Sequence, residues 1–411
     1  MAALSFSDIR AILKERYPNG LPLDVFYKTA PFLAMVPKDE DLAFGDVIKV
    51  PVVYGNPQSV GADFSTAQAL AEGTRQKAFK VTTKNYYGFG AITGEAIKKG
   101  SRDPGSFIDT LDFQIKGAMT TVKRSLLRYL FGNGGGALGQ ISATSNPATA
   151  TITLANPYDV VYFEPGMVIR SATTDGTSGS LRTGSVTLTA VNRSTGELTA
   201  SGNWTAGITG GGGAATGDYL FRSGDFGAVM DGFRAWVPDS APTSSLFYDV
   251  DRTSDSRLGG MRADLSSLPI REAVQKALKI LHVEESEADF AVLNSEDWLS
   301  LSFALQAAGT YSTDVIRTEA GIGIEAIKMG GPGGMCKIIA DPGAPKGRLL
   351  AGQLDTWKLC TMGNLVDFLD DDGMPYLRQA TADAVELRVV SRGNLVCYAP
   401  GKNGNFLIGT T

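Results

Sequence analysis

The chain has 411 residues, of which 43% are hydrophobic and 20% charged, so it can bury a core and is not disordered as a whole. Its formal net charge of -5, with 38 Lys and Arg against 43 Asp and Glu, excludes the basic surplus that is typical of a protein coating nucleic acid. The single histidine argues against most histidine-dependent catalytic sites, and the three scattered cysteines argue against a disulfide framework and a zinc site. The 49 glycines predict many turns and β-ribbons.

Residues 1–45 are predicted to form an N-terminal arm. A short amphipathic helix is expected near its start, because Phe6, Ile9 and Leu13 fall on one helical face. Four prolines between residues 18 and 37 prevent a long helix, so the arm needs a surface to lie on. The first ten residues lack the apolar segment of a signal peptide, and no apolar run is long enough to span a bilayer.

Residues 46–92 are predicted to form a long β-ribbon. The stretches 46–54 and 80–89 are rich in β-branched and aromatic residues, so we assign them as its two strands. A loop as long as residues 55–77 is normally disordered or functional, and a two-stranded ribbon is marginal alone in water. We therefore expect the ribbon to project and to contact another subunit. The candidate contact residues are Tyr54, Phe64, Arg75, Lys77, Lys80 and Lys84.

Residues 93–136 contain the strongest predicted helix, at 106–131. Apolar residues recur there every three or four positions, which gives one continuous stripe. We expect Ser106 to cap the helix and the glycines at 132–136 to end it. At about 1.5 Å per residue the helix is a rod of about 37 Å, long for a globular domain. The predicted core residues of this spine helix are Ile108, Leu111, Ile115, Met119, Val122 and Leu126.

Residues 137–224 are predicted to be an inserted small all-β domain. Within 137–217 only seven residues are charged, and three stretches, 150–154, 185–191 and 197–201, alternate with the period of a strand. Turn residues separate these stretches, which indicates a small barrel or sandwich. Gly132–Gly136 and Gly210–Gly213 are expected to be its two flexible joints.

The host domain is predicted to resume at 225–265. Residues 266–375 then alternate between helix and strand, with helices from 270 and from about 295, and strands at 289–293, 337–340 and 348–351. Residues 376–411 hold a closing run of strands, at 383–390, 395–398 and 405–408. The chain is therefore assigned to the α+β class.

Patterns that could indicate an enzyme or a binding site have simpler explanations. His282 closes a predicted helix, where the helix dipole favours it. Residues 321–326 match G-x-G-x-x-A, but a polar stretch precedes them and glycines soon follow. The acidic run 367–373 lacks calcium-loop spacing. Trp204 and Tyr162 are more readily explained as core aromatics than as platforms for sugars. We expect no catalytic residue, no metal and no cofactor.

The order of arm, ribbon with a long loop, spine helix, α/β unit and closing strands resembles the major capsid proteins of tailed bacteriophages, the Hong Kong 97 fold. The residues that carry the likeness are Pro31–Met35, the extended stretch Val47–Lys84, the spine helix 106–131, and Gly217–Asp225 with Trp236. The resemblance covers nearly the whole chain and rests on element order.

The resemblance implies a division of the chain and a function. It implies an E-loop (46–92), a P-domain with the spine helix (93–136, 225–265 and 376–411) and an A-domain (266–375). The protein would then form hexamers and pentamers in an icosahedral shell around double-stranded DNA, without sequence-specific binding. It would be made in the cytoplasm of a bacterial host, and the partners that the resemblance implies are a separate scaffolding protein, a portal and a decoration protein.

Two other functions are compatible with the sequence. One is an encapsulin-type compartment of the same fold, which would hold a protein cargo. The other is a carbohydrate-active or glycan-binding protein, which would bind through the Thr- and Ser-rich insert. The contents of a particle would separate the first from a capsid, and glycan binding by residues 137–217 would support the second.

Overall fold

The computed structural model describes residues 30–40, 45, 47–95, 104–243, 246–307, 313–317, 323–369, 376–378 and 381–409. The surroundings of the side chains at 104–116, 313–317, 323–325 and 376–377 are not among the described features. The predicted amphipathic helix near the N-terminus and most of the acidic run 367–373 lie outside the described residues.

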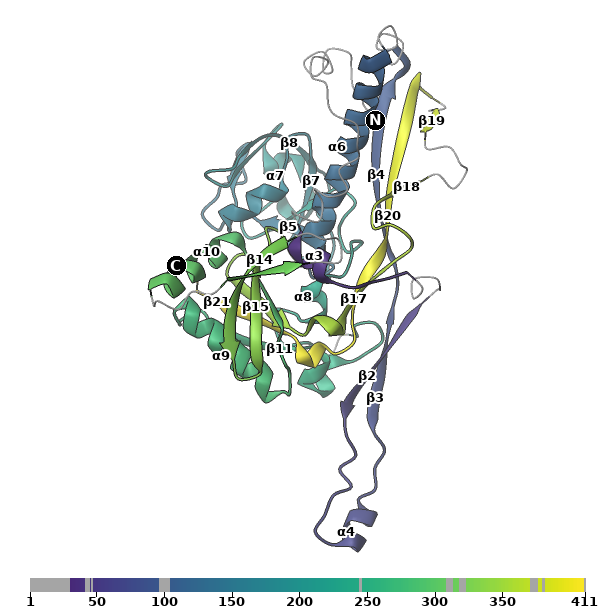
Figure 1. The fold of residues 1–411 in the computed structure, drawn as a ribbon. Coiled ribbons are helices and arrows are strands. Elements are labelled where there is room, and N and C mark those ends of the chain that lie inside the picture. Colours follow the sequence, from purple (N-terminus) through teal and green to yellow (C-terminus); the bar gives the residue numbers. More distant parts are fainter. Residues whose placement is uncertain are drawn as a thin grey trace.

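A long helix packed on a long pair of strands forms the central spine of the molecule (Figure 1). Helix α6 spans Pro104–Leu130, which confirms the predicted spine helix; Ser106 lies inside it and is not its cap. It packs on β4 (Lys84–Thr93), which pairs antiparallel with β20 (Ala384–Cys397). Close packing is possible because β4 carries Gly88, where a Cβ would lie 2.5 Å from Val122 Cγ2.

Four further strands complete this spine sheet. Strands β17 (Trp357–Thr361), β18 (Asp367–Phe368) and β19 (Tyr376–Arg378) pair with β20, and β1 (Lys38–Asp39) pairs parallel with β17. The sequence placed residues 80–89 in the projecting ribbon and 357–361 in the α/β unit. The structure instead places β4 and β17 in the spine sheet, where both pair with β20. The sequence could not show this, because the partner strand is distant in the chain.

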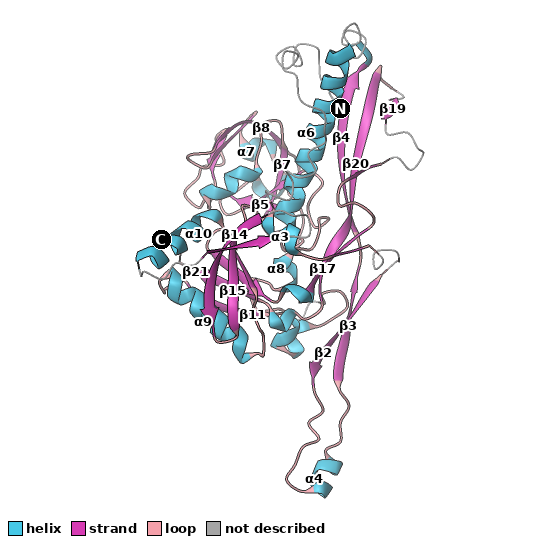
Figure 2. Cartoon of the chain, viewed as in Figure 1, coloured by secondary structure: helices cyan, strands magenta, loops and turns pink. Residues whose placement is uncertain are grey.

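The ribbon itself is formed by β2 (Ile48–Gly55) and β3 (Arg75–Val81), which pair antiparallel. It extends away from the body and ends in a short helix, α4 (Phe64–Ala69) (Figure 2). The predicted first strand is confirmed, whereas the second begins earlier than expected, at Arg75.

A second large sheet has the order β11-β21-β16-β12-β15-β14-β13. Its strands are β11 (Met261–Leu265), β12 (Phe290–Leu293), β13 (Thr313–Arg317), β14 (Gly323–Gly331), β15 (Gly334–Ala340), β16 (Arg348–Gly352) and β21 (Gly404–Ile408). Helices α9 (Ile270–Val283) and α10 (Ser295–Ala307) contact each other and this sheet. The predicted helices and strands of this region are confirmed. Strands β11 and β21, which the sequence assigned to the P-domain, pair with it instead.

The two faces of this second sheet pack against different cores. On β12, Phe290 and Val292 join the buried cluster that includes the end of α6, whereas Ala291 and Leu293 join the cluster under α9 and α10. This division follows from the two-residue period of a strand. The sheet is therefore the layer that connects its helices to the spine.

Residues 137–222 form a separate six-stranded sheet beside α6 (Figure 1). The strands are β5 (Ala137–Gln140), β6 (Thr151–Thr153), β7 (Val168–Ala172), β8 (Val186–Asn192), β9 (Glu197–Ala200) and β10 (Tyr219–Arg222), in the order β5-β10-β7-β8-β9-β6. Two backbone hydrogen bonds, Ala155 N to Gln140 O (2.8 Å) and Ser142 N to Thr153 O (2.9 Å), join the outer strands, so the sheet closes on itself. Short helices η2 (Pro157–Tyr162), α7 (Trp204–Gly207) and η3 (Gly210–Gly212) accompany it. Most of its buried apolar residues belong to the same apolar cluster as the spine.

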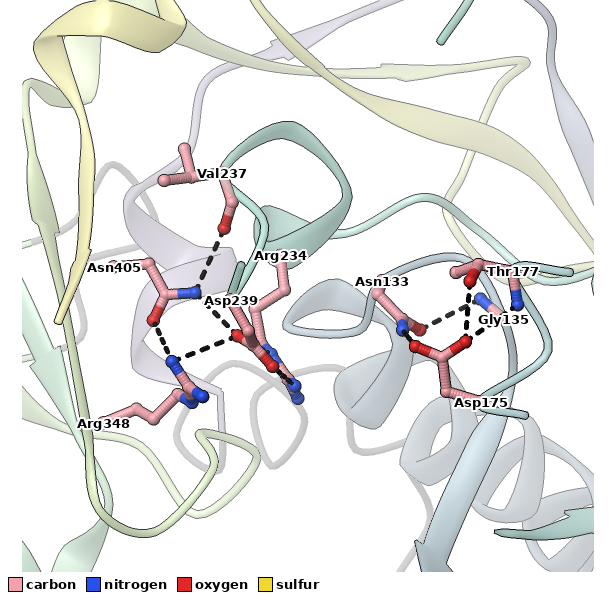
Figure 3. Close-up of polar contacts among 9 residues, drawn as sticks. All are labelled: Asn133, Gly135, Asp175, Thr177, Arg234, Val237, Asp239, Arg348 and Asn405. Atoms are coloured by element: carbon pink, nitrogen blue, oxygen red, sulfur yellow. Dashed lines mark hydrogen bonds and ion pairs between the residues drawn. The ribbon is translucent and has the colours of Figure 1, made fainter. Parts of the chain in front are cut away.

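The glycine-rich joint between α6 and β5 is closely packed. A Cβ on Gly135 would lie 2.1 Å from the carbonyl oxygen of Asp175, and Gly227 N donates to Gly135 O at 2.9 Å. Figure 3 shows Asn133 donating to the Asp175 carboxylate at 2.6 Å beside this contact. The expected flexible joint was therefore wrong here, because the missing side chains allow two backbones to touch.

Replacing Gly135 with alanine should destabilise the subunit by about 2–3 kcal/mol, because the new methyl group must push two backbones apart. The melting temperature of the purified variant tests this. Gly202→Ala is the matched control, since a Cβ there meets nothing within 4 Å. Equal melting temperatures for the two variants would contradict the close packing of the joint.

Candidate functional site: the projecting ribbon

The base of the ribbon is held by the body of its own subunit. Residues on β2 alternate between buried and exposed, and Val50 lies opposite Phe79, both fully buried. The Phe79 ring packs edge-on against Trp236, with ring centroids 5.2 Å apart, and against Phe247 at 6.1 Å. The ribbon is therefore supported over its first half, which the sequence did not predict.

Three of the candidate contact residues lie at this base. The Lys77 ammonium donates to Asp251 O at 2.9 Å and to Ser254 Oγ at 2.6 Å, and it lies 5.5 Å from the Tyr54 ring centroid. The Lys80 ammonium pairs with Asp249 at 2.9 Å, with both side chains more than half exposed. Tyr54, Lys77 and Lys80 thus contact their own chain.

A tight turn at Phe247–Val250 sets the direction of the ribbon. Its central residues, Tyr248 and Asp249, have φ of 50° and 66°, a left-handed conformation that costs energy in residues other than glycine. The turn accepts a hydrogen bond from Lys80 N to Tyr248 O at 3.1 Å. Such strain persists only where its surroundings enforce it, so the turn is a fixed support for β3.

A partly buried polar network, centred on the buried Asn394, connects this turn to the spine sheet. The Asn394 amide on β20 donates to Tyr248 Oη at 2.8 Å and to the carbonyl oxygen of Thr82, between β3 and β4, at 2.9 Å. The Tyr248 hydroxyl donates to the Asp231 carboxylate. Burial, and then the Asp231 charge, raise the pKa of Tyr248, so this hydroxyl keeps its proton. The chain bends at Thr82, between β3 of the ribbon and β4 of the spine sheet, and we call this bend the elbow. Its position is therefore fixed by the side chains of Asn394, Tyr248 and Asp231.

The tip of the ribbon, in contrast, extends away from the described part of the body (Figure 1). Helix α4 begins after Asp63, whose carboxylate accepts from Thr66 N at 3.2 Å; hydrogen bonds from Ser65 and Thr66 lower the Asp63 pKa. Phe64 is 80% exposed, and Val60 and Leu70 are also exposed. Exposed apolar side chains that gather at a projecting tip are typical of an interaction surface.

The remaining candidate contact residues are less exposed or already paired. Arg75 pairs with Glu72 at 3.3 Å on the surface, and Lys84 is half-buried at the start of β4. Of the six candidates, Phe64 is therefore the one with an exposed apolar side chain at the tip. Sequence reasoning missed Val60 and Leu70, whose only signal was to be isolated apolar residues in a polar loop.

The predicted core residues of the spine helix are described only for its second half. Val122 and Leu126 are buried, and Met119 is partly buried against the same cluster. Ile108, Leu111 and Ile115 lie in α6, where side-chain surroundings are not described. The sequence did not predict that Tyr129, one turn beyond Leu126, donates to the buried Asp225 carboxylate.

Two arginines share one carboxylate where the chain passes from the spine to the second sheet. Asp239 pairs with Arg234 and, at 3.3 Å, with Arg348, and it accepts from Asn405 Nδ2 at 2.8 Å (Figure 3). Although burial opposes ionisation, the bond from Arg234 and both guanidinium charges lower the Asp239 pKa. Asn405 Nδ2 also donates to Val237 O at 3.1 Å, so the group is fully occupied by structural contacts.

Other patterns noted in the sequence do not form a site. Residues 323–326 belong to strand β14, where a dinucleotide fingerprint requires the start of a helix. Trp204 is buried, with its indole donating to Ala150 O at 2.9 Å, so it is no platform for a sugar. His282 lies exposed in the last turn of α9. Within the described ranges, no cluster of three or more His, Cys, Asp or Glu is placed to hold a metal ion.

None of the helices in the described part of the chain is both long and apolar enough to cross a bilayer.

Known proteins were compared with the chain by sequence and by structure. No protein-family model matches the sequence, and no curated protein matches it. Similar solved structures include the capsid asymmetric unit of cyanophage A-1(L), 9% identical, with a TM-score of 0.48 over 99% of this chain and 100% of that one. They also include the capsid of a native GTA particle (8% identical, TM-score 0.45, 97% and 94%) and that of Myoviridae phage XM1 (7%, 0.43, 96% and 95%). Each of these three solved structures is a capsid.

Proposed function

We propose that this chain is the major capsid protein of a tailed double-stranded DNA bacteriophage. The observation that supports this most directly is the projecting ribbon: its base and elbow are fixed by the body, while its tip presents Phe64, Val60 and Leu70 to another molecule. A ribbon that is fixed at its base and carries exposed apolar side chains at its tip suits a subunit that packs over its neighbour. The contact would be heterologous, so repeated copies would close into rings.

The proposed assembly is an icosahedral shell of hexamers and pentamers, located in the virion and enclosing the genome. In this proposal residues 46–81 are the E-loop, α6 with the spine sheet is the P-domain, and the second sheet with α9 and α10 is the A-domain. The net charge of -5 suits a container, because mild repulsion from DNA phosphates is screened by salt while the cargo is not gripped. A structural role without catalysis, a separate scaffolding protein and a portal belong to the same proposal.

Electron microscopy of the purified protein, alone and with its scaffolding protein, tests the proposed function. We expect closed shells with hexameric and pentameric units. A chain that stays monomeric under every condition, scaffold included, would refute the proposal. Particles filled with an enzyme in place of DNA would instead support an encapsulin-type compartment.

A further inference from the structure

A buried carboxylate joins the N-terminal segment to the second sheet. Asp341 follows β15 and is fully buried. One carboxylate oxygen accepts from Gly343 N at 2.9 Å, and the other accepts from Phe32 N at 3.2 Å, across 309 positions of sequence. No described residue forms an ion pair with Asp341. Within the described part of the chain, the carboxylate is thus held by two backbone amides, without a cation.

The segment that it holds is the short helix α3 (Pro31–Met35) with its flanking residues. Ala30, Phe32 and Leu33 are buried. The Phe32 ring packs against Phe131 at the end of the spine (centroids 5.3 Å apart) and Phe290 on β12 (5.5 Å). These rings exclude water from the site, so Asp341 lies in an apolar junction between three parts of the fold.

The titratable groups around this junction do not neutralise Asp341. Helix α3 carries none, and the rings packed on Phe32 are Phe131, which directly follows α6, and Phe290 on β12. On η2, Tyr162 Oη donates to Gly343 O at 3.5 Å, and its pKa is raised by burial, with the charges of Asp159 and Asp341 contributing. The Arg128 guanidinium of α6 lies 4.4 Å from the Tyr162 ring centroid, and Lys346, in the loop after Asp341, lies 3.6 Å from the Tyr158 ring.

We propose that Asp341 is a proton-controlled latch, whose neutral form holds residues 30–36 against the body and whose ionised form releases them. The geometry supports this because the two amides can bond either form, whereas only the ionised form bears an unpaired charge in an apolar junction. Release of the segment would expose the carboxylate to water and remove that cost.

The direction of the pH dependence follows from linkage. Burial raises the pKa of Asp341 from 3.8 to about 6, with the bonds from Gly343 and Phe32 opposing the rise. A carboxyl group whose pKa is higher in the docked state binds its proton more tightly there, so docking is strongest below pH 4 and weakens as the pH rises through 6. Because this window spans about two units, the docking equilibrium should fall about 100-fold between pH 4 and pH 7.

Hydrogen exchange of the full chain tests the latch. The reporters are the amides of Ala34 and Val36, which bond Ala30 O and Phe32 O at 3.1 Å. After correction for intrinsic exchange rates, we expect their protection to fall up to about 100-fold, with the decrease lying between pH 4 and pH 6 and a plateau above pH 6. A wild-type protection that does not change between pH 4 and pH 7, or that rises with pH over this range, would overturn the proposal without any variant.

Two variants locate the effect. Asp341→Asn stays neutral at every pH, so protection of these amides should lose its pH dependence. Asp297→Asn removes another buried carboxylate, which accepts from Gly347 N at 2.7 Å near the same loop, and it should keep the wild-type dependence. Retention of the dependence in Asp341→Asn would also overturn the latch. None of these readouts requires a shell to form.

Discussion

Replacing Leu126 with aspartate is expected to destabilise the subunit by about 4 kcal/mol, because it puts a charge into a site without polar partners. Leu126 is only 4% exposed and belongs to the cluster that joins α6, the spine sheet and the closed β-sheet. The new carboxyl group must either be buried with its charge or take up a proton. Both outcomes weaken the core on which the ribbon and the second sheet depend.

Thermal or urea unfolding of the purified variant measures this effect. Thr120→Asp is the matched control, because Thr120 is an exposed residue of the same helix. We expect the control to change stability by less than about 0.5 kcal/mol, the usual range for a surface substitution. Similar unfolding curves for both variants would mean that the apolar stripe of α6 does not form the core.

The second large effect is expected at the ribbon tip, where Phe64→Asp should leave the subunit stable and block shell assembly. In the isolated subunit Phe64 is 80% exposed, so its loss removes no contact within the body. If the tip packs on a neighbour, burial of this ring contributes about 1.5–3 kcal/mol per contact. Its loss should then lower the association constant at least about tenfold, and a shell repeats the contact many times.

Light scattering and electron microscopy follow assembly, and the melting temperature reports on the fold. Gln68→Asp is the control, since Gln68 is an exposed polar residue of the same helix α4. A deletion of residues 57–73 should have the stronger form of the same effect, because β2 and β3 stay paired without the tip. Normal shells from the deletion variant would show that the tip is not an inter-subunit contact.

The candidate site could be predicted from sequence only in outline. The long polar loop and the marginal stability of a two-stranded ribbon indicated a projecting segment, and Phe64 was named on that basis. The base of the ribbon was missed, because Phe79 is covered by Trp236 and Phe247, about 160 residues away in the chain. Lys77 and Lys80 were expected to contact a neighbouring subunit, because their partners are also far away in the chain. In the structure Lys77 bonds to Asp251 O and Lys80 pairs with Asp249 of the same subunit.

The sequence by itself determined the local elements, because these depend on periodicity and on turn residues close in the chain. The spine helix, α9, and strands such as β12, β15 and β16 lie where the apolar patterns placed them. The tertiary structure decided which strands share a sheet. Strand β4, which was predicted in the ribbon, pairs with β20, and β21, which was predicted in the P-domain, pairs with β16 of the second sheet. Each pairing depends on a partner that is distant in the chain. It also decided that Gly135 is a close contact and that Asp341 holds the N-terminal segment, because burial and desolvation arise only when remote segments meet.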